Sequence, residues 1–165
     1  MRVLVTGASG YIGSRLVAAL LDAGDEVFAA SRSPESLEVF DWYNDVEATK
    51  LDASQAESLN EAFVAAGPIE VAYYLVHAIG EDDYRAQDRK AARLFAEAAA
   101  AAGVHRIVYL GGFVPDEELS EPLASRADVG EALDVEGVEV VWLRAAIVLG
   151  AGSTSFEMLR YLADR

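Results

Sequence analysis

The chain has 165 residues and carries 28 acidic against 13 basic residues, which gives a formal net charge of −15. A chain of this length is typical of one domain, and its charge opposes binding to nucleic acid or to an anionic membrane surface. Cysteine is absent and there are only two histidines, so the sequence excludes disulfides and predicts no metal site.

The longest apolar run, residues 71–79, is too short to span a bilayer, so the sequence predicts no membrane segment. An apolar run begins at Val3, which leaves no room before it for the parts of a cleavable leader. Together with the lack of cysteine, this leads us to expect a cytoplasmic location.

Predicted strands and helices alternate along the chain. Strand-like runs cover residues 2–6, 26–31, 46–50, 70–77, 105–111 and 138–144, and helical runs cover residues 11–23, 55–65, 81–102, 122–133 and 154–163. Glycines follow four of the helical runs, where a left-handed cap is wanted: Gly24, Gly67, Gly103 and Gly137. The pattern predicts an α/β fold: a single three-layer domain over residues 1–165, with a Rossmann-type doubly wound parallel sheet in the order 3-2-1-4-5-6.

A glycine-rich segment joins the first strand to the first helix. Gly7 permits a tight turn, Gly10 lets a diphosphate approach the backbone, and Gly13 lets the helix lie close to the strand. Unpaired N–H groups and the helix dipole would then hold the anion. A glycine turn can also join two elements without binding anything, but its place between a strand and a helix favours a dinucleotide site.

The end of the second predicted strand bears on the choice of dinucleotide. No carboxylate stands there to bind an adenosine ribose, whereas Arg32, with the hydroxyl of Ser31 or Ser33, could bind a 2′-phosphate. The alternative is an ordinary surface arginine. We therefore expect NADP(H) as the preferred cofactor, with NAD(H) as the second candidate.

Three further positions lie after strands at the same predicted edge. Asp52 either accepts a hydrogen bond from the adenine or caps the following helix, a role that Ser54 could also fill. Trp42 either covers the adenine or closes an end of the sheet. Residues 76–78 end the fourth predicted strand near the expected nicotinamide ribose, where His77 is either a proton donor or a packing residue.

These segments resemble the short-chain dehydrogenase/reductase superfamily, in its extended and atypical branch with the NmrA-like NAD(P)H-binding proteins. The resemblance rests on TGASGYIG at residues 6–13, SRSP at 31–34, AGVHRIVYL at 102–110 and VWLRAAIVLG at 141–150. It implies that the chain lacks the C-terminal substrate lobe of longer relatives and can pair through the helices at 81–102 and 122–133. The cofactor contacts that it implies are Gly7, Ser9, Gly10, Tyr11, Ile12, Arg32, Asp52, Val76, His77 and Ala78.

The sequence departs from this superfamily at the usual catalytic residues. Active members use a tyrosine with a lysine four residues later, but the two lysines here, Lys50 and Lys90, follow Val46 and Ala86 at that spacing. Arg126 stands near the lysine position, and Gly111 and Gly112 follow the fifth strand in place of a serine. We therefore expect an NADP(H)-binding domain of an atypical oxidoreductase with an unknown small-molecule substrate, or a non-catalytic NADP(H) sensor.

Overall fold

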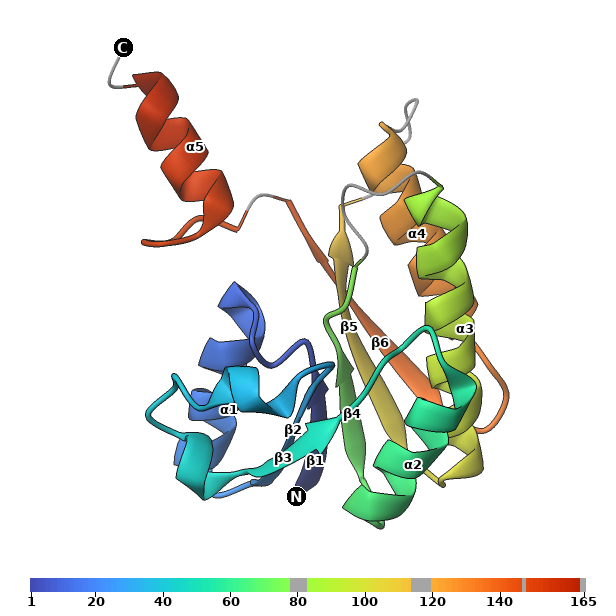
Figure 1. Ribbon diagram of the computed structural model, residues 1–165. Coiled ribbons are helices and arrows are strands. Elements are labelled where there is room, and N and C mark those ends of the chain that lie inside the picture. The colour runs from blue at the N-terminus through green and yellow to red at the C-terminus, as the bar shows by residue number, and fades with distance from the viewer. Residues whose placement is uncertain (78–82, 114–119, 147, 164–165) are drawn as a thin grey trace.

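Six parallel strands form one sheet in the computed structural model, which describes residues 1–77, 83–113, 120–146 and 148–163 (Figure 1). The strand order is β3-β2-β1-β4-β5-β6, as the sequence predicted, and every neighbouring pair is parallel. The strands are β1 (Arg2–Thr6), β2 (Glu26–Ser31), β3 (Glu47–Lys50), β4 (Val71–Tyr74), β5 (Arg106–Gly112) and β6 (Glu139–Ala145).

The helices lie where the sequence predicted them, within one to three residues at each described end. They are α1 (Tyr11–Asp22), α2 (Ala56–Ala66), α3 (Tyr84–Ala101), α4 (Glu121–Leu133) and α5 (Thr154–Ala163). The predicted start of the third helix, residues 81 and 82, lies outside the described residues. The segment after β2 also forms two short 3-10 helices, η1 (Pro34–Leu37) and η2 (Tyr43–Asp45). All four expected glycines have positive φ angles, and Gly24 and Gly103 directly follow the cap residues of α1 and α3. Gly67 is the cap residue of α2 but has a ψ of −149°, and Gly137 lies beyond Asp134, the cap residue of α4.

The fourth strand is shorter than predicted. We expected it to reach His77, but it ends at Tyr74. The Leu75 N–H donates to the Thr6 hydroxyl at 3.1 Å instead of continuing the ladder. Residues 75–77 therefore leave the sheet at its carboxyl edge, close to the end of β1.

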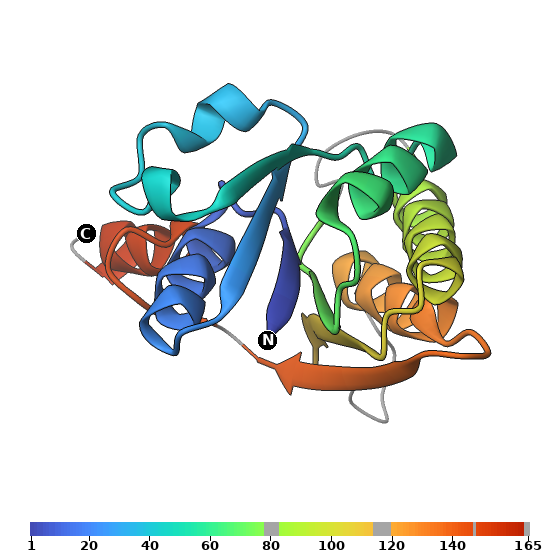
Figure 2. The same cartoon turned by 90° about the horizontal axis from the view of Figure 1, so that it is seen from below.

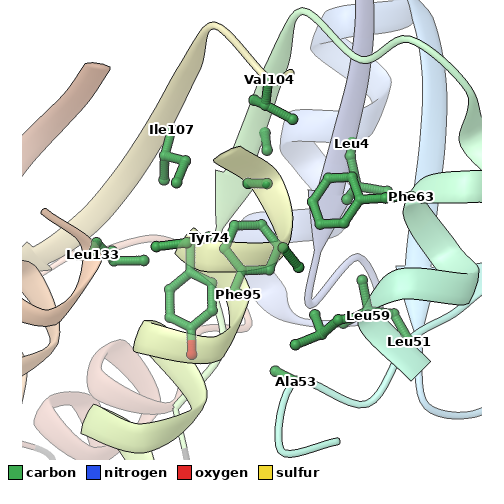
Figure 3. Packing of buried hydrophobic residues seen from close by; sticks show 14 of the residues in the cluster. Leu4, Leu51, Ala53, Leu59, Phe63, Tyr74, Phe95, Val104, Ile107 and Leu133 are labelled. Carbon is green, nitrogen blue, oxygen red and sulfur yellow. The ribbon is translucent and has the colours of Figure 1, made fainter. Parts of the chain in front are cut away.

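Helices cover the sheet on both faces (Figure 2). Helix α1 and the segment after β2 pack on one face, and α2, α3 and α4 pack on the other. The larger core cluster lies on the α2–α4 face, where Phe95 packs against Phe63 and Tyr74 with ring centroids 5.6 and 4.9 Å away (Figure 3). The sheet thus has one apolar layer on each face, and loops lie at its carboxyl edge.

Trp42 belongs to the smaller core cluster beside α1. Its side chain is buried and stacks on Phe40, and its indole N–H donates to the Ser14 carbonyl oxygen at 3.0 Å. Trp42 therefore fastens the segment after β2 to α1, a role that differs from both expectations for this residue.

Helix α5 extends away from the sheet (Figure 1), and its Met158, Tyr161 and Leu162 side chains are exposed. Within the described ranges, no helix is long and apolar enough to cross a bilayer.

Candidate functional site

The turn between β1 and α1 has the geometry that its glycines predict. Gly7 has a φ of +66°, and its carbonyl oxygen accepts the Gly10 N–H at 2.9 Å. A Cβ on Gly13 would overlap that carbonyl oxygen and lie 2.8 Å from the Gly7 carbonyl carbon. The first turn of α1 therefore packs directly on the backbone of the turn.

The N-terminus of α1 suits an anionic diphosphate. No side chain in the described part of the structure caps this helix, and its first turn contains no acidic residue. The N–H groups of Tyr11, Ile12 and Gly13 are thus among the helix donors that ordinarily require an outside partner. A Cβ on Gly10 would meet only the Gly7 oxygen within 4 Å, at 3.2 Å, so the space that this Cβ would take is otherwise open to a ligand. Ser9 is exposed in the same turn.

Thr6 brings the end of β4 to this turn. Its buried hydroxyl donates to the Tyr73 carbonyl oxygen at 3.0 Å and accepts the Leu75 N–H. The following residues, Val76 and His77, are half-buried. Ala78, the remaining predicted contact in this segment, lies outside the described residues.

Arg32 and Asp52 lie at the other end of the expected site, after β2 and β3. Arg32 is exposed and has no ion-pair partner among the described residues. A hydrogen bond from Ser54 holds the pKa of Asp52 below its ordinary value, and the positive charge of Arg32 lowers it further. The two side chains therefore lie within electrostatic range of each other.

The helix-cap expectation for Asp52 and Ser54 is wrong. Helix α2 begins at Ala56, and the residue at its cap position is Gln55, whose side chain makes no capping hydrogen bond to the described residues. Asp52 instead accepts hydrogen bonds from the Ser54 N–H and hydroxyl at 2.9 and 2.7 Å, and from the Gln55 amide at 3.1 Å. The Asp52 carboxylate thus receives its hydrogen bonds from neighbouring residues in a turn that precedes the helix.

A cavity of about 370 Å³ adjoins the glycine turn. Its wall includes Tyr11 and Ile12 of α1, His77 after β4, Arg126 of α4 and Ser153 before α5. A larger groove of about 890 Å³ lies between α3 and α4, but the glycine turn contributes nothing to it. Among the described residues, no three histidine or acidic side chains gather as ligands for a metal ion.

The cavity lacks the usual tyrosine and lysine pair. Tyr109, on β5, is fully buried, and its hydroxyl donates to the Arg126 carbonyl oxygen at 3.0 Å. Burial raises the pKa of Tyr109 well above its ordinary value, so this phenol is unsuited to proton transfer at neutral pH. At the end of β5, Gly111 lines the cavity near the position where the superfamily resemblance led us to expect a serine.

His77 is paired with a carboxylate that sequence reasoning missed. Its Nδ1 lies 3.6 Å from Asp88 Oδ2, and the Ser125 hydroxyl donates to the same oxygen at 3.1 Å. The available signal was periodicity, because Asp88 stands four residues before Ala92 and seven before Phe95 on the buried stripe of α3. A carboxylate on such a stripe needs polar partners from elsewhere in the fold.

The sheet order and the open glycine turn together define a Rossmann-type dinucleotide-binding domain. Residues 7–137 match the NAD(P)H-binding family, and the chain belongs to that family.

Solved structures share this fold. The chain is 25% identical to the triphenylmethane reductase of Citrobacter sp. in complex with NADP(H), with a TM-score of 0.77 over 99% of this chain and 55% of that chain. It is 22% identical to ChuY, an anaerobillin reductase of Escherichia coli O157:H7, with a TM-score of 0.75 over 94% of this chain and 77% of that chain. It is also 22% identical to WbmG of Bordetella bronchiseptica in complex with NAD, with a TM-score of 0.71 over 87% of this chain and 52% of that chain.

The chain therefore spans about half the length of the triphenylmethane reductase and of WbmG. The expected membership in the short-chain dehydrogenase/reductase superfamily, with its NmrA-like branch, is confirmed.

Proposed function

We propose that this chain binds NADP(H) in preference to NAD(H), as the cofactor-binding part of an oxidoreductase that works without a YxxxK pair. The observation that carries the proposal is Arg32, an exposed cation directly after β2, because the last residues of that strand, Ala29, Ala30 and Ser31, include no carboxylate. NAD-selective sites usually place an acidic residue at this position, and NADP-selective sites an arginine. The NADP(H) complex of the triphenylmethane reductase supports the same choice.

Each part of the dinucleotide has a matching group on the chain. The N–H groups at the start of α1 would bind the diphosphate, and Asp52 the adenine amino group. Arg32 would bind the 2′-phosphate together with Ser33, because the Ser31 hydroxyl already contacts Ser36 at 3.2 Å and accepts the Ser33 N–H at 3.3 Å. The bound cofactor would supply or accept a hydride beside the cavity.

Calorimetric titration with NADPH, NADP⁺, NADH and NAD⁺ tests this proposal. We expect Arg32→Ala to weaken NADPH and NADP⁺ binding about ten- to a hundredfold, the value of one charge-assisted contact, and to leave NADH binding unchanged. Arg93→Ala is the matched control, because Arg93 is an exposed arginine on α3 whose ion pair within the described part of the chain is with Glu97 on its own helix. Equal losses of NADPH and NADH affinity in Arg32→Ala would refute the phosphate assignment.

A non-catalytic NADP(H) sensor is the second candidate. It is favoured by the position of Tyr109, whose hydroxyl is committed to the Arg126 carbonyl oxygen, and by Gly111 at the expected serine position. Tight NADPH binding without oxidation of NADPH by any member of a panel of quinones and carbonyl compounds would support the sensor. Intact folding without any binding would refute both functions.

A further inference from the structure

Three elements contribute to a polar cluster of His77, Asp88 and Ser125, of which His77 lines the cavity. His77 follows β4, Asp88 lies on α3, and Ser125 lies on α4. Asp88 and Ser125 are 4% and 2% exposed, and the His77 side chain is 16% exposed. The cluster therefore joins the cavity to the interface between α3 and α4.

The carboxylate of Asp88 is costly for the fold. A buried carboxylate must be compensated by hydrogen bonds or charge, whereas alanine would suit this alanine-rich stripe without any such demand. The Ser125 hydroxyl donates to Asp88 and the His77 ring faces the same carboxylate oxygen, so the partners of Asp88 include a fixed donor and a titratable base. The pair lies beside the cavity, because His77 is part of the cavity wall.

The orientation of the imidazole follows from the chemistry of its neighbour. An ionised carboxylate only accepts hydrogen bonds, so Asp88 selects the form of His77 that carries its proton on Nδ1. The distance of 3.6 Å is slightly longer than a hydrogen bond, as is common for catalytic pairs before a ligand binds. Nε2 is then left for the cavity, and it has no hydrogen-bond partner among the described residues.

We propose that His77 transfers the proton of the reaction through Nε2, and that Asp88 and Ser125 are positioning residues that hold its imidazole. This inference rests on the proposed function. With a quinone as acceptor, NADPH, the quinone and one proton become NADP⁺ and the hydroquinone. The proton donor is the His77 imidazolium, which carries a proton on each ring nitrogen. It gives the Nε2 proton to the reduced quinone oxygen, is left as the neutral form with its proton on Nδ1, and regains a proton on Nε2 from solvent.

The nitrogen chemical shifts of the two histidines in the ligand-free protein test the positioning role directly. We expect neutral His77 to carry its proton on Nδ1, and exposed His105 in the same spectrum to show the tautomer ratio of free imidazole. In Asp88→Ala, His77 should change to the ratio of His105. Ser125→Ala should cause a smaller change in the same direction, and it serves as the second variant if Asp88→Ala does not fold. A His77 proton on Nε2 in the wild type, or an unchanged spectrum in both variants, would overturn the proposal.

Kinetics with NADPH and menadione test proton transfer. We expect kcat to fall about a hundredfold in His77→Gln. In Asp88→Ala, the change should be larger in kcat, which falls, than in KM. His105→Gln, at the opposite edge of the sheet, is the control that should keep the wild-type rate. Wild-type kcat in His77→Gln, or no turnover by a wild type that binds NADPH in the calorimeter, would overturn the proton-transfer role alone. A wild-type protein that does not bind NADPH would instead overturn the proposed function.

Discussion

Alanine at Gly10 and at Gly13 should separate cofactor binding from folding. The two glycines lie three residues apart in one turn, but their surroundings differ. A Cβ at Gly13 would overlap the Gly7 carbonyl oxygen and lie 2.8 and 3.0 Å from two further backbone atoms, which cannot move aside as a flexible side chain can. A Cβ at Gly10 would meet one atom at 3.2 Å, and its φ of −76° is allowed for alanine.

These contacts set the expected magnitudes. Gly13→Ala should lower the free energy of unfolding by about 2–3 kcal/mol, the upper part of the range for overpacking. Gly10→Ala should change it by less than about 1 kcal/mol, because the loss at the cap is offset by the lower entropy of the unfolded chain. The new methyl group would, however, stand before the N–H groups of α1. NADPH affinity should therefore fall at least about tenfold, or about 1.4 kcal/mol.

Urea denaturation followed by circular dichroism measures the first quantity, and calorimetric titration with NADPH measures the second. Gly24→Ala is a control for backbone strain alone, because Gly24 has a φ of +82° and open space around its Cβ position. It should lose about 1 kcal/mol of stability and no affinity. Wild-type NADPH affinity in Gly10→Ala would refute the assignment of this turn to the diphosphate.

Three further substitutions test the packing and electrostatics of the frame around the site. Phe95→Ala, at a fully buried position of the larger core, should cost about 3–5 kcal/mol in urea denaturation, and a cost below about 1 kcal/mol would contradict the packing described here. Trp42→Phe removes the hydrogen bond to the Ser14 carbonyl oxygen and should cost about 1–2 kcal/mol by the same assay, whereas unchanged stability would show that this bond does not fasten the segment. A hydrogen bond from Arg85 holds the pKa of Asp128 below its ordinary value, so its contribution is present at neutral pH and is lost as the pH falls below about 4. The stability difference between wild type and Asp128→Asn should therefore shrink in acid denaturation series, and a difference that stays constant with pH would refute this link.

Much of the fold could be predicted from local patterns. Hydrophobic runs separated by helical segments indicated the parallel sheet, and glycines such as Gly24 and Gly103 marked the ends of helices because few other residues adopt positive φ angles there. The spacing of Gly7, Gly10 and Gly13 likewise predicted a close turn before a helix, which the contacts of Gly13 confirm.

The carboxyl edge of the sheet was harder to predict, because contacts between distant residues determine it. The end of β4 depends on the Thr6 hydroxyl, which accepts a hydrogen bond from the N–H of Leu75, 69 positions away in the sequence. The apolar pattern of β4 continues through Leu75 and Val76, beyond Tyr74, the last residue of the strand. The sequence alone therefore does not mark the end of β4.

The sequence by itself determined the class of the domain and the place of its anion-binding turn, since periodicity and glycine spacing act over a few neighbouring residues. Only the tertiary structure decided that Trp42 packs on α1, and that the buried Asp88 stands between His77 and Ser125. Asp88 and Ser125 are 37 positions apart and lie on different helices. Their meeting depends on how α3 and α4 pack together on the sheet, which no local pattern encodes.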